Sequence, residues 1–330
     1  MITAEKLKIQ VKTKAHKNNL QPQDIMQMYF FERLLYRISI SGYKHNFILK
    51  GGLLLSAIFG DERRTTQDMD TMIKGIELDF EEIKKVIEEI VNIELDDNIK
   101  YEFIKYKDIR EEDKYGGIKI FLMAYKEHLQ VPLSIDISIN DPITPRELEF
   151  KYKCMFDDNY INIMAYTIET IIAEKFETLI EDNIGNTRSK DFYDLYMLIT
   201  NHFETLNGDV IIKAIKRTFK RREFPYDVKE IVKTFEIIKN SEALKSNYTN
   251  RYIPKNIYAK DISYEENIKI INIISSVALR GNKQESVYCA TNGVKGAEYG
   301  KSMMKLLSEK LTKEFGVGFS IRNIEQMRKL

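Results

Sequence analysis

One stretch of the chain, residues 47–70, limits the possible fold more than any other. It reads FILKGGLLLSAIFGDERRTTQDMD: a short apolar run, the Gly51–Gly52 pair, an apolar segment of helical length, an Arg/Thr patch and two aspartates. Glycines that lead into a helix let backbone N–H groups approach an anion closely, with the positive end of the helix dipole behind them. The pattern therefore predicts a strand, a glycine turn and a helix that together form a phosphate site.

The stretch closes on Asp68 and Asp70, which are spaced as alternate residues of a strand. Side chains at i and i+2 of a strand point to the same face. Mg²⁺ prefers one or two carboxylates together with substrate phosphates. Each feature alone has an ordinary alternative, because glycine pairs mark turns and acids are common at surfaces. Together they indicate nucleotide chemistry at a magnesium site.

The composition is that of a globular chain with one large domain or two modest ones. Of its 330 residues 43% are hydrophobic, and 51 Lys and Arg side chains face 50 Asp and Glu, so any nucleic-acid contact must come from a local patch. Cys154 and Cys289 lack metal-ligand spacing, which indicates a reducing compartment. Because there is no signal-peptide core and no apolar run long enough to span a bilayer, we expect a cytoplasmic protein that contacts no membrane.

A third acid stands in a strongly alternating segment, Val131 to Ile139, which reads VPLSIDISI. Leucine and isoleucines occupy one face, and Asp136 lies on the other, between two serines. One interpretation is the solvent side of an edge strand, since alternation is the ordinary pattern of a half-covered sheet. The other is a carboxylate that joins Asp68 and Asp70 from a neighbouring strand.

Past Pro145 the pattern changes to helices. Thr167 can cap a helix whose apolar stripe contains Lys175, and this lysine either extends to solvent or reaches into a charged cleft. A polar loop follows, and Asp191 opens the next helix, where an acid complements the helix dipole; Asp194 fits a solvated face. Residues 209–222 are rich in Lys and Arg, which fits either a solvated helix face or a local phosphate-backbone contact.

These segments, taken in order, resemble the AbiEii/AbiGii-type nucleotidyltransferase toxins of the DNA polymerase β-like superfamily. The likeness covers roughly residues 20–245, with one departure: Leu53 stands where many members have Ser or Thr. The residues that carry it fall in three motifs: Leu49, Lys50, Gly51, Gly52, Leu55, Arg64, Thr66, Asp68 and Asp70; Leu133, Ile135, Asp136, Ile137 and Asp141; and Ala173, Glu174, Lys175, Leu179, Asn186, Arg188, Lys190, Asp191, Tyr193, Asp194, Leu195 and Tyr196.

The resemblance implies a function and a set of site residues. It implies a transfer of NMP from an NTP substrate to an acceptor hydroxyl, such as the 3′ end of an RNA or tRNA, with Mg²⁺ or Mn²⁺ as the cofactor and Asp136 or Asp191 as the base. It also implies the toxin half of a type IV toxin–antitoxin or abortive-infection system for phage defence, whose antitoxin acts mainly on gene expression. The metal ligands would be Asp68, Asp70 and Asp136, the catalytic set would add Lys175 and Asp191, and the nucleotide would contact Lys50, Gly51, Gly52, Arg64, Thr66, Lys175, Arg188 and Lys190.

We therefore expect an α/β (α+β) fold in three parts. Residues 1–150 would form a nucleotidyltransferase-type mixed sheet with flanking helices, and residues 151–260 a helical domain that contributes Lys175 and Asp191. Residues 261–330 would form a short helical tail.

The rival hypothesis for the function is an adaptor that binds NTP, nucleic acid or protein with little turnover.

The tail resembles the N-terminal helical domain of YhcG-like nucleases, and we expect it to bind a partner or nucleic acid without nuclease activity, or to be a relic of gene fusion. The matching residues are Tyr299, Gly300, Leu307, Ser308, Leu311, Phe315, Gly316, Gly318, Phe319, Ser320, Asn323, Met327 and Arg328.

Overall fold

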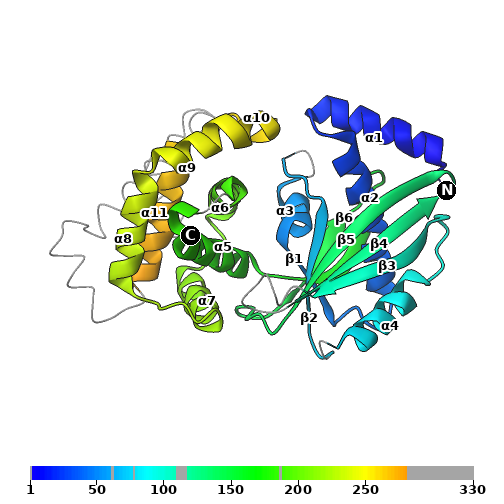
Figure 1. Ribbon diagram of the computed structural model, residues 1–330, viewed down its shortest axis with the longest axis horizontal. Coiled ribbons are helices and arrows are strands. Elements are labelled where there is room, and N and C mark those ends of the chain that lie inside the picture. The colour runs from blue at the N-terminus through cyan, green and yellow to red at the C-terminus, as the bar shows by residue number, and fades with distance from the viewer. Residues whose placement is uncertain (1, 61–62, 77–78, 109–116, 186–187, 281–330) are drawn as a thin grey trace. The chain divides into compact units, whose positions relative to one another are not determined.

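The computed structural model describes residues 2–60, 63–76, 79–108, 117–185 and 188–280 of the chain (Figure 1). The chain divides into two units, Met1–Asn272 and Ile273–Leu330, and the sheet and the candidate site lie in the first. The motif expected in residues 297–328 lies outside the described residues, so the resemblance of the tail stays a prediction.

A single mixed sheet of seven strands forms the core of the first unit. Its spatial order is β3-β4-β5-β2-β1-β7-β6. The pairs β2/β5 and β1/β7 are parallel, and the other neighbours are antiparallel. The strands are β1 (Phe47–Lys50), β2 (Asp68–Ile73), β3 (Lys100–Asp108), β4 (Gly117–Lys126), β5 (Leu129–Ile139), β6 (Leu148–Lys153) and β7 (Tyr160–Ala165). The mixed α/β architecture expected from the sequence is confirmed.

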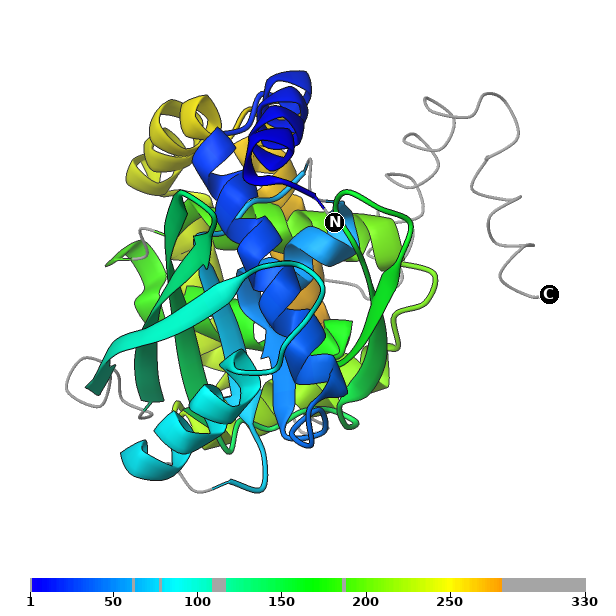
Figure 2. The ribbon, with the colours of Figure 1, turned by 90° about the vertical axis from the view of Figure 1, so that its right-hand side faces the viewer.

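Helices cover one face of this sheet, where the apolar side chains of the alternating strands point. In β5 the apolar residues Leu133, Ile135 and Ile137 are buried while the residues between them are half-exposed. Helix α2 (Pro22–Ile40) packs on β5 and β7, and α4 (Phe80–Val91) packs on α2 and β3. Figure 2 shows α2 lying across the strands, with α1 (Ala4–Asn18) at its upper end. The polar residues of β2 and β5 therefore point to the opposite face.

Two expectations from the sequence are wrong. Strands β6 and β7 follow Pro145, where we expected helices; in β7 the buried Ile161, Ile163 and Ala165 alternate with more exposed residues, and a segment of six residues is too short for this period to stand out. Strand β5 is central in the sheet, not an edge strand. Asp136 thus does not owe its polar position to a sheet edge.

After the sheet the chain is helical. Side-chain caps begin several of these helices, and Thr167 caps α5 as predicted. The elements are α5 (Ile168–Asp182), η1 (Asn183–Gly185), α6 (Ser189–His202), α7 (Gly208–Arg221), α8 (Val228–Lys239), α9 (Glu242–Asn247), η2 (Tyr248–Tyr252), α10 (Ile253–Lys255), η3 (Ile257–Ala259) and α11 (Tyr264–Arg280), with α3 (Gly51–Phe59) placed earlier, between β1 and β2. Among the described residues, none of the helices combines the length and the hydropathy needed to cross a lipid bilayer.

The basic segment at residues 209–222 has two distinct faces. Its three lysines are exposed on α7, as a solvated face requires. Arg217 instead donates to the carbonyl of Ile143 at 2.7 Å and to the hydroxyl of Thr144 at 2.9 Å. Arg221 donates to the carbonyl of Asn140 at 3.2 Å. Arg217 and Arg221 thus hold α7 against the segment that follows β5 through these hydrogen bonds.

Candidate active site

Strand register places four charged side chains in one row across the sheet. Lys50 of β1 lies opposite Asp70 of β2, Asp70 lies opposite Asp136 of β5, and Asp136 lies opposite Lys119 of β4. Residues directly opposite each other on neighbouring strands share a face. Asp68, two residues before Asp70, shares it too. The two adjacent strands β2 and β5 therefore bring the three predicted acids to one surface, flanked by Lys50 of β1 on one side and Lys119 of β4 on the other.

The glycine pair lets Asp70 approach the start of α3. Gly51 has φ +63°, and a Cβ atom there would lie 1.9 Å from Oδ2 of Asp70. The backbone N–H of Gly52 donates to the same oxygen at 3.2 Å. A side chain at position 51 would thus be strained by its backbone and would also collide with the carboxylate. The glycine pair therefore does more than reverse the chain, because it allows the Asp70 carboxylate of β2 to contact the beginning of α3.

Thr66 links the same turn to Asp68. A Cβ atom on Gly52 would lie 2.5 Å from the Thr66 hydroxyl oxygen, and this hydroxyl donates to the backbone carbonyl of Asp68 at 3.1 Å. Leu53 is fully buried, so this position supplies packing to the core and no hydroxyl to a phosphate.

Lys119 was missed by the sequence reasoning. Its Nζ lies 3.1 Å from Oδ1 of Asp136 and 4.0 Å from Oδ1 of Asp68. Burial raises the pKa of Asp136, and the charges of Asp70 and Asp68 add to this rise, while Lys119 opposes it. The alternation of β4 could have placed Lys119 on a polar face, but only the pairing of β4 with β5 shows that this face carries the acids.

The three acids have the chemistry of a magnesium site. They offer hard carboxylate oxygens from two adjacent strands, and Oδ1 of Asp136 is buried with no hydrogen-bond partner beyond the Lys119 ammonium nearby. A carboxylate in that state is favoured by a nearby cation. In the part of the chain that the structure describes, no group of three acidic, His or Cys side chains is already arranged around a metal position. The chemistry of these residues fits Mg²⁺, and in this structure the Lys119 ammonium supplies the positive charge beside them.

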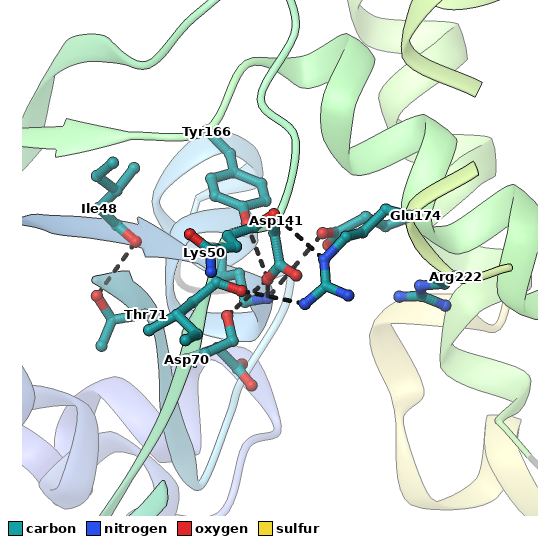
Figure 3. Close-up of polar contacts among 12 residues, drawn as sticks. Ile48, Lys50, Asp70, Thr71, Asp141, Tyr166, Glu174 and Arg222 are labelled. Carbon is teal, nitrogen blue, oxygen red and sulfur yellow. Dashed lines mark hydrogen bonds and ion pairs between the residues drawn. The ribbon is translucent and has the colours of Figure 1, made fainter. Parts of the chain in front are cut away.

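Lys50 is held in a buried network that joins the sheet to α5 (Figure 3). Its Nζ lies 2.7 Å from Oδ2 of Asp141 and 4.0 Å from Oε1 of Glu174. Asp141 also accepts hydrogen bonds from Ser138 at 2.6 Å and Tyr166 at 3.3 Å. Burial alone would lower the pKa of Lys50, but the charges of Glu174 and Asp141 outweigh it and raise the pKa. Lys50 thus faces protein carboxylates here, and its contact with a nucleotide stays a prediction.

Lys175 reaches into a charged cluster and does not extend to solvent. Its Nζ lies 2.5 Å from Oδ1 of Asp191 and 2.8 Å from Oδ2 of Asp194, and its side chain is 13% exposed. Arg64 Nε lies 2.9 Å from Oδ1 of Asp194. Burial would raise the pKa of Asp194, but Arg64 and Lys175 hold it below its usual range. Asp194 is fully buried, so the solvated face expected for it is wrong.

Arg188 and Lys190 lie at the start of α6, beside this cluster. Arg188 Nε lies 3.4 Å from Oδ2 of Asp191. The pKa of Lys190 is lowered by desolvation of its ammonium and by the nearby charges of Arg64 and Arg188. Asn186, which completes the family motif, lies outside the described residues.

Helix α5 connects the two groups of charges. Its adjacent residues Glu174 and Lys175 contact Lys50 and Asp191 respectively, and Lys50 is the residue opposite Asp70. Among the contacts of the described residues, none joins Lys175 directly to the three acids. The fold therefore connects the row of acids to the Lys175 cluster through Lys50, its contact with Glu174, and the backbone of α5.

Comparison with known proteins identifies one family. The family described as nucleotidyl transferase AbiEii toxin of type IV toxin–antitoxin systems matches residues 33–261. Two solved structures from Helicobacter pylori have similar folds. The first, JHP933, has 13% identity and a TM-score of 0.49 over 83% of this chain and 99% of its own. The second, described as a candidate nucleotidyltransferase, has 15% identity and a TM-score of 0.44 over 80% and 99%. No curated protein sequence matches the chain.

Replacement of Gly51 should destabilise the fold. We expect Gly51→Ala to lower the free energy of unfolding by about 2 kcal/mol or more, because of the left-handed backbone and the contact with Asp70. Urea denaturation measures this change. Gly208→Ala is the control, since a Cβ atom at Gly208 meets nothing within 4 Å. Equal stability of the two variants would show that the turn relaxes freely.

Glu177 should make stability depend on pH. It is fully buried beside Arg222, and burial raises its pKa to about 7. Because the folded state then binds a proton more tightly than the unfolded state, this group loses its stabilising effect as pH rises from about 4.5 to about 7. Between pH 5 and pH 8, we expect the free energy of unfolding of wild type to fall by roughly 1–3 kcal/mol more than that of Glu177→Gln.

Urea denaturation at both pH values tests this, with the exposed Glu204→Gln as control. Parallel pH profiles for wild type and Glu177→Gln would contradict the prediction.

Proposed function

Because the chain belongs to the AbiEii nucleotidyltransferase toxin family of type IV toxin–antitoxin systems, we propose that its row of acids is the active site of an NMP transfer from an NTP to an acceptor hydroxyl. The observation that carries the proposal is the register that sets Asp70 opposite both Lys50 and Asp136. This register sets the carboxylates beside the Gly51–Gly52 turn, which supports a site in which metal ligands and phosphate donors would be neighbours.

Asp68, Asp70 and Asp136 would hold Mg²⁺ in this proposal. A bound divalent metal supplies Lewis-acid stabilisation of phosphoryl oxygens. The backbone N–H of Gly52, at the start of α3, donates to Asp70, and the N–H groups of this helix start would bind phosphate oxygens of the substrate. Arg188 and Lys190 at the start of α6, Thr66 beside the turn, and Arg64 would contribute to the same electrostatic environment.

The transfer would proceed by attack of the acceptor oxygen on the α-phosphorus. An O–P bond forms to the acceptor, the bond to pyrophosphate breaks, and the hydroxyl proton passes to a carboxylate. Asp136 suits this role better than Asp191, since its raised pKa favours accepting a proton, whereas Asp191 is buried in its ion pair with Lys175. Lys175, kept charged by two carboxylates that raise its pKa against burial, would neutralise charge on the phosphates.

An RNA acceptor is supported by the surface beside Lys119. On β3, Lys107 lies opposite Lys119, and Lys105 lies opposite Phe121. The ammonium of Lys105 is 5.0 Å from the centre of the Phe121 ring. Lysines beside a half-exposed aromatic ring on a sheet are suited to a single strand, whose phosphates they bind and whose bases stack on the ring. We propose that the acceptor strand crosses this surface towards the acids.

The biological role follows from the family and is part of the proposal. The protein would act as the toxin of a two-component system in the cytoplasm, with a cognate antitoxin that controls it mainly at the level of gene expression, and would serve abortive infection against phage. The buried Leu53 favours a second candidate, an adaptor that binds NTP without transfer, because one phosphate contact of the family is absent.

Loss of Asp70 should abolish transfer. With Mg²⁺, labelled NTPs and total RNA, we expect Asp70→Asn to reduce label transfer at least about a hundredfold, the scale for removing an electrostatic catalytic group. Asp158→Asn, at an exposed turn, removes a carboxylate elsewhere and should transfer at the wild-type rate. NTP binding by wild type without transfer to any acceptor would support the adaptor, and transfer in the absence of RNA would indicate a small-molecule or protein acceptor.

Charge reversal on β3 should weaken RNA use selectively. We expect the double variant Lys105→Glu, Lys107→Glu to raise the KM for RNA about tenfold or more. The KM should also depend less steeply on salt concentration than in wild type, because two phosphate contacts are lost. The Kd for NTP should stay unchanged. The matched control is Lys151→Glu, Lys153→Glu, with the same spacing on the exposed side of β6. Equal effects of the two double variants would place the RNA elsewhere.

A further inference from the structure

Lys119 is an ammonium inside a carboxylate site. It stands directly opposite Asp136 in the register of β4 and β5, and its Nζ lies 3.1 Å from Asp136 and 4.0 Å from Asp68. Three carboxylates on one sheet surface repel one another, so a cation beside them is stabilising. In the described part of the chain, Lys119 is the lysine that supplies this charge to Asp136 and Asp68.

Lys119 is also held less firmly than the other lysines of the site. Lys50 and Lys175 have side chains 17% and 13% exposed and make contacts of 2.7 Å and 2.5 Å with their nearest carboxylates. Lys119 is 27% exposed, and its nearest carboxylate contact is longer, 3.1 Å to Asp136, with Asp68 4.0 Å away. A lysine ammonium on a flexible four-carbon chain with a longer nearest contact and more exposure can leave at smaller cost than the other two.

We propose that Lys119 is an internal counter-ion that competes with the divalent metal for Asp68 and Asp136, so that the metal binds weakly alone and tightly together with a triphosphate. The inference rests on the proposed function, since it takes these acids as the metal ligands. The metal must displace the ammonium, and a triphosphate that extends from the Gly51–Gly52 turn across the row of acids towards β4 gives the displaced ammonium a new anionic partner. Metal and nucleotide then favour each other's binding, a coupling that is reciprocal.

The inference is tested by metal binding, without any transfer reaction. Mn²⁺ is titrated into the full chain and followed by electron paramagnetic resonance, with and without a non-reactive NTP analogue. We expect Lys119→Met to bind Mn²⁺ alone roughly fivefold or more tightly than wild type and to lose most of the tightening that the analogue gives to wild type. Lys119→Arg, which keeps the charge, should bind Mn²⁺ about as weakly as wild type.

Two control variants separate the possible failures. Lys74→Met removes a lysine from a different ion pair, with Glu147, and should leave Mn²⁺ binding unchanged. If Asp70→Asn loses Mn²⁺ binding but Lys119→Met binds no more tightly than wild type, the counter-ion role is overturned while the metal site stands. If Asp70→Asn binds Mn²⁺ as wild type does, the acids are not the metal site, and the proposed function fails with the inference.

Thermal melting checks that each variant is folded, and Lys119→Gln replaces Lys119→Met if the latter is not. Lys119→Gln should also bind Mn²⁺ more tightly than wild type, and unchanged binding by a folded Lys119→Gln would overturn the proposal.

Discussion

The candidate site depends on the position of Asp70 between two neighbouring strands and the beginning of a helix. Strand β2 pairs antiparallel with β1 and parallel with β5, and this fixes Lys50 on one side of Asp70 and Asp136 on the other. The carboxylate then meets the turn at Gly51, where any side chain would collide with it. A shift of one residue in either pairing would turn the acids to the apolar face, so the buried isoleucines of β5 and the acids maintain each other's orientation.

Paired charges extend this arrangement into the helices. A buried charge is costly unless it is paired and hydrogen-bonded, and Lys50 and Lys175 each lie near two carboxylates. Because Lys50 is the last residue of strand β1 and Lys175 belongs to α5, these pairs link the Gly51–Gly52 turn to α5 and α6. The same contacts that stabilise the fold therefore position the groups proposed to meet the triphosphate.

The sequence predicted most of the elements before Pro145 and the shared face of Asp68 and Asp70, but less about the residues that neighbour these acids. Gly51, Gly52 and the aspartate pair could be found because local rules on turns and strand faces apply within one stretch. Strand order could not be predicted, since it depends on pairings between distant segments. The sequence therefore left open whether β5 is an edge strand, and it did not show that Lys119 lies beside the acids. Asp194 was misjudged because its partner Arg64 lies 130 residues away, and a helix pattern reports a polar residue without showing whether it is paired.

The central claim is that Asp68, Asp70 and Asp136 together bind the metal that accompanies the triphosphate. A crystal of the full chain grown with Mn²⁺ and a non-reactive NTP analogue tests it most directly, because the anomalous scattering of manganese locates the ion. The account predicts an anomalous peak within metal–ligand distance of carboxylate oxygens from both β2 and β5, next to the Gly51–Gly52 turn. A peak elsewhere, or an ion held by the nucleotide alone with the three carboxylates unengaged, would contradict it.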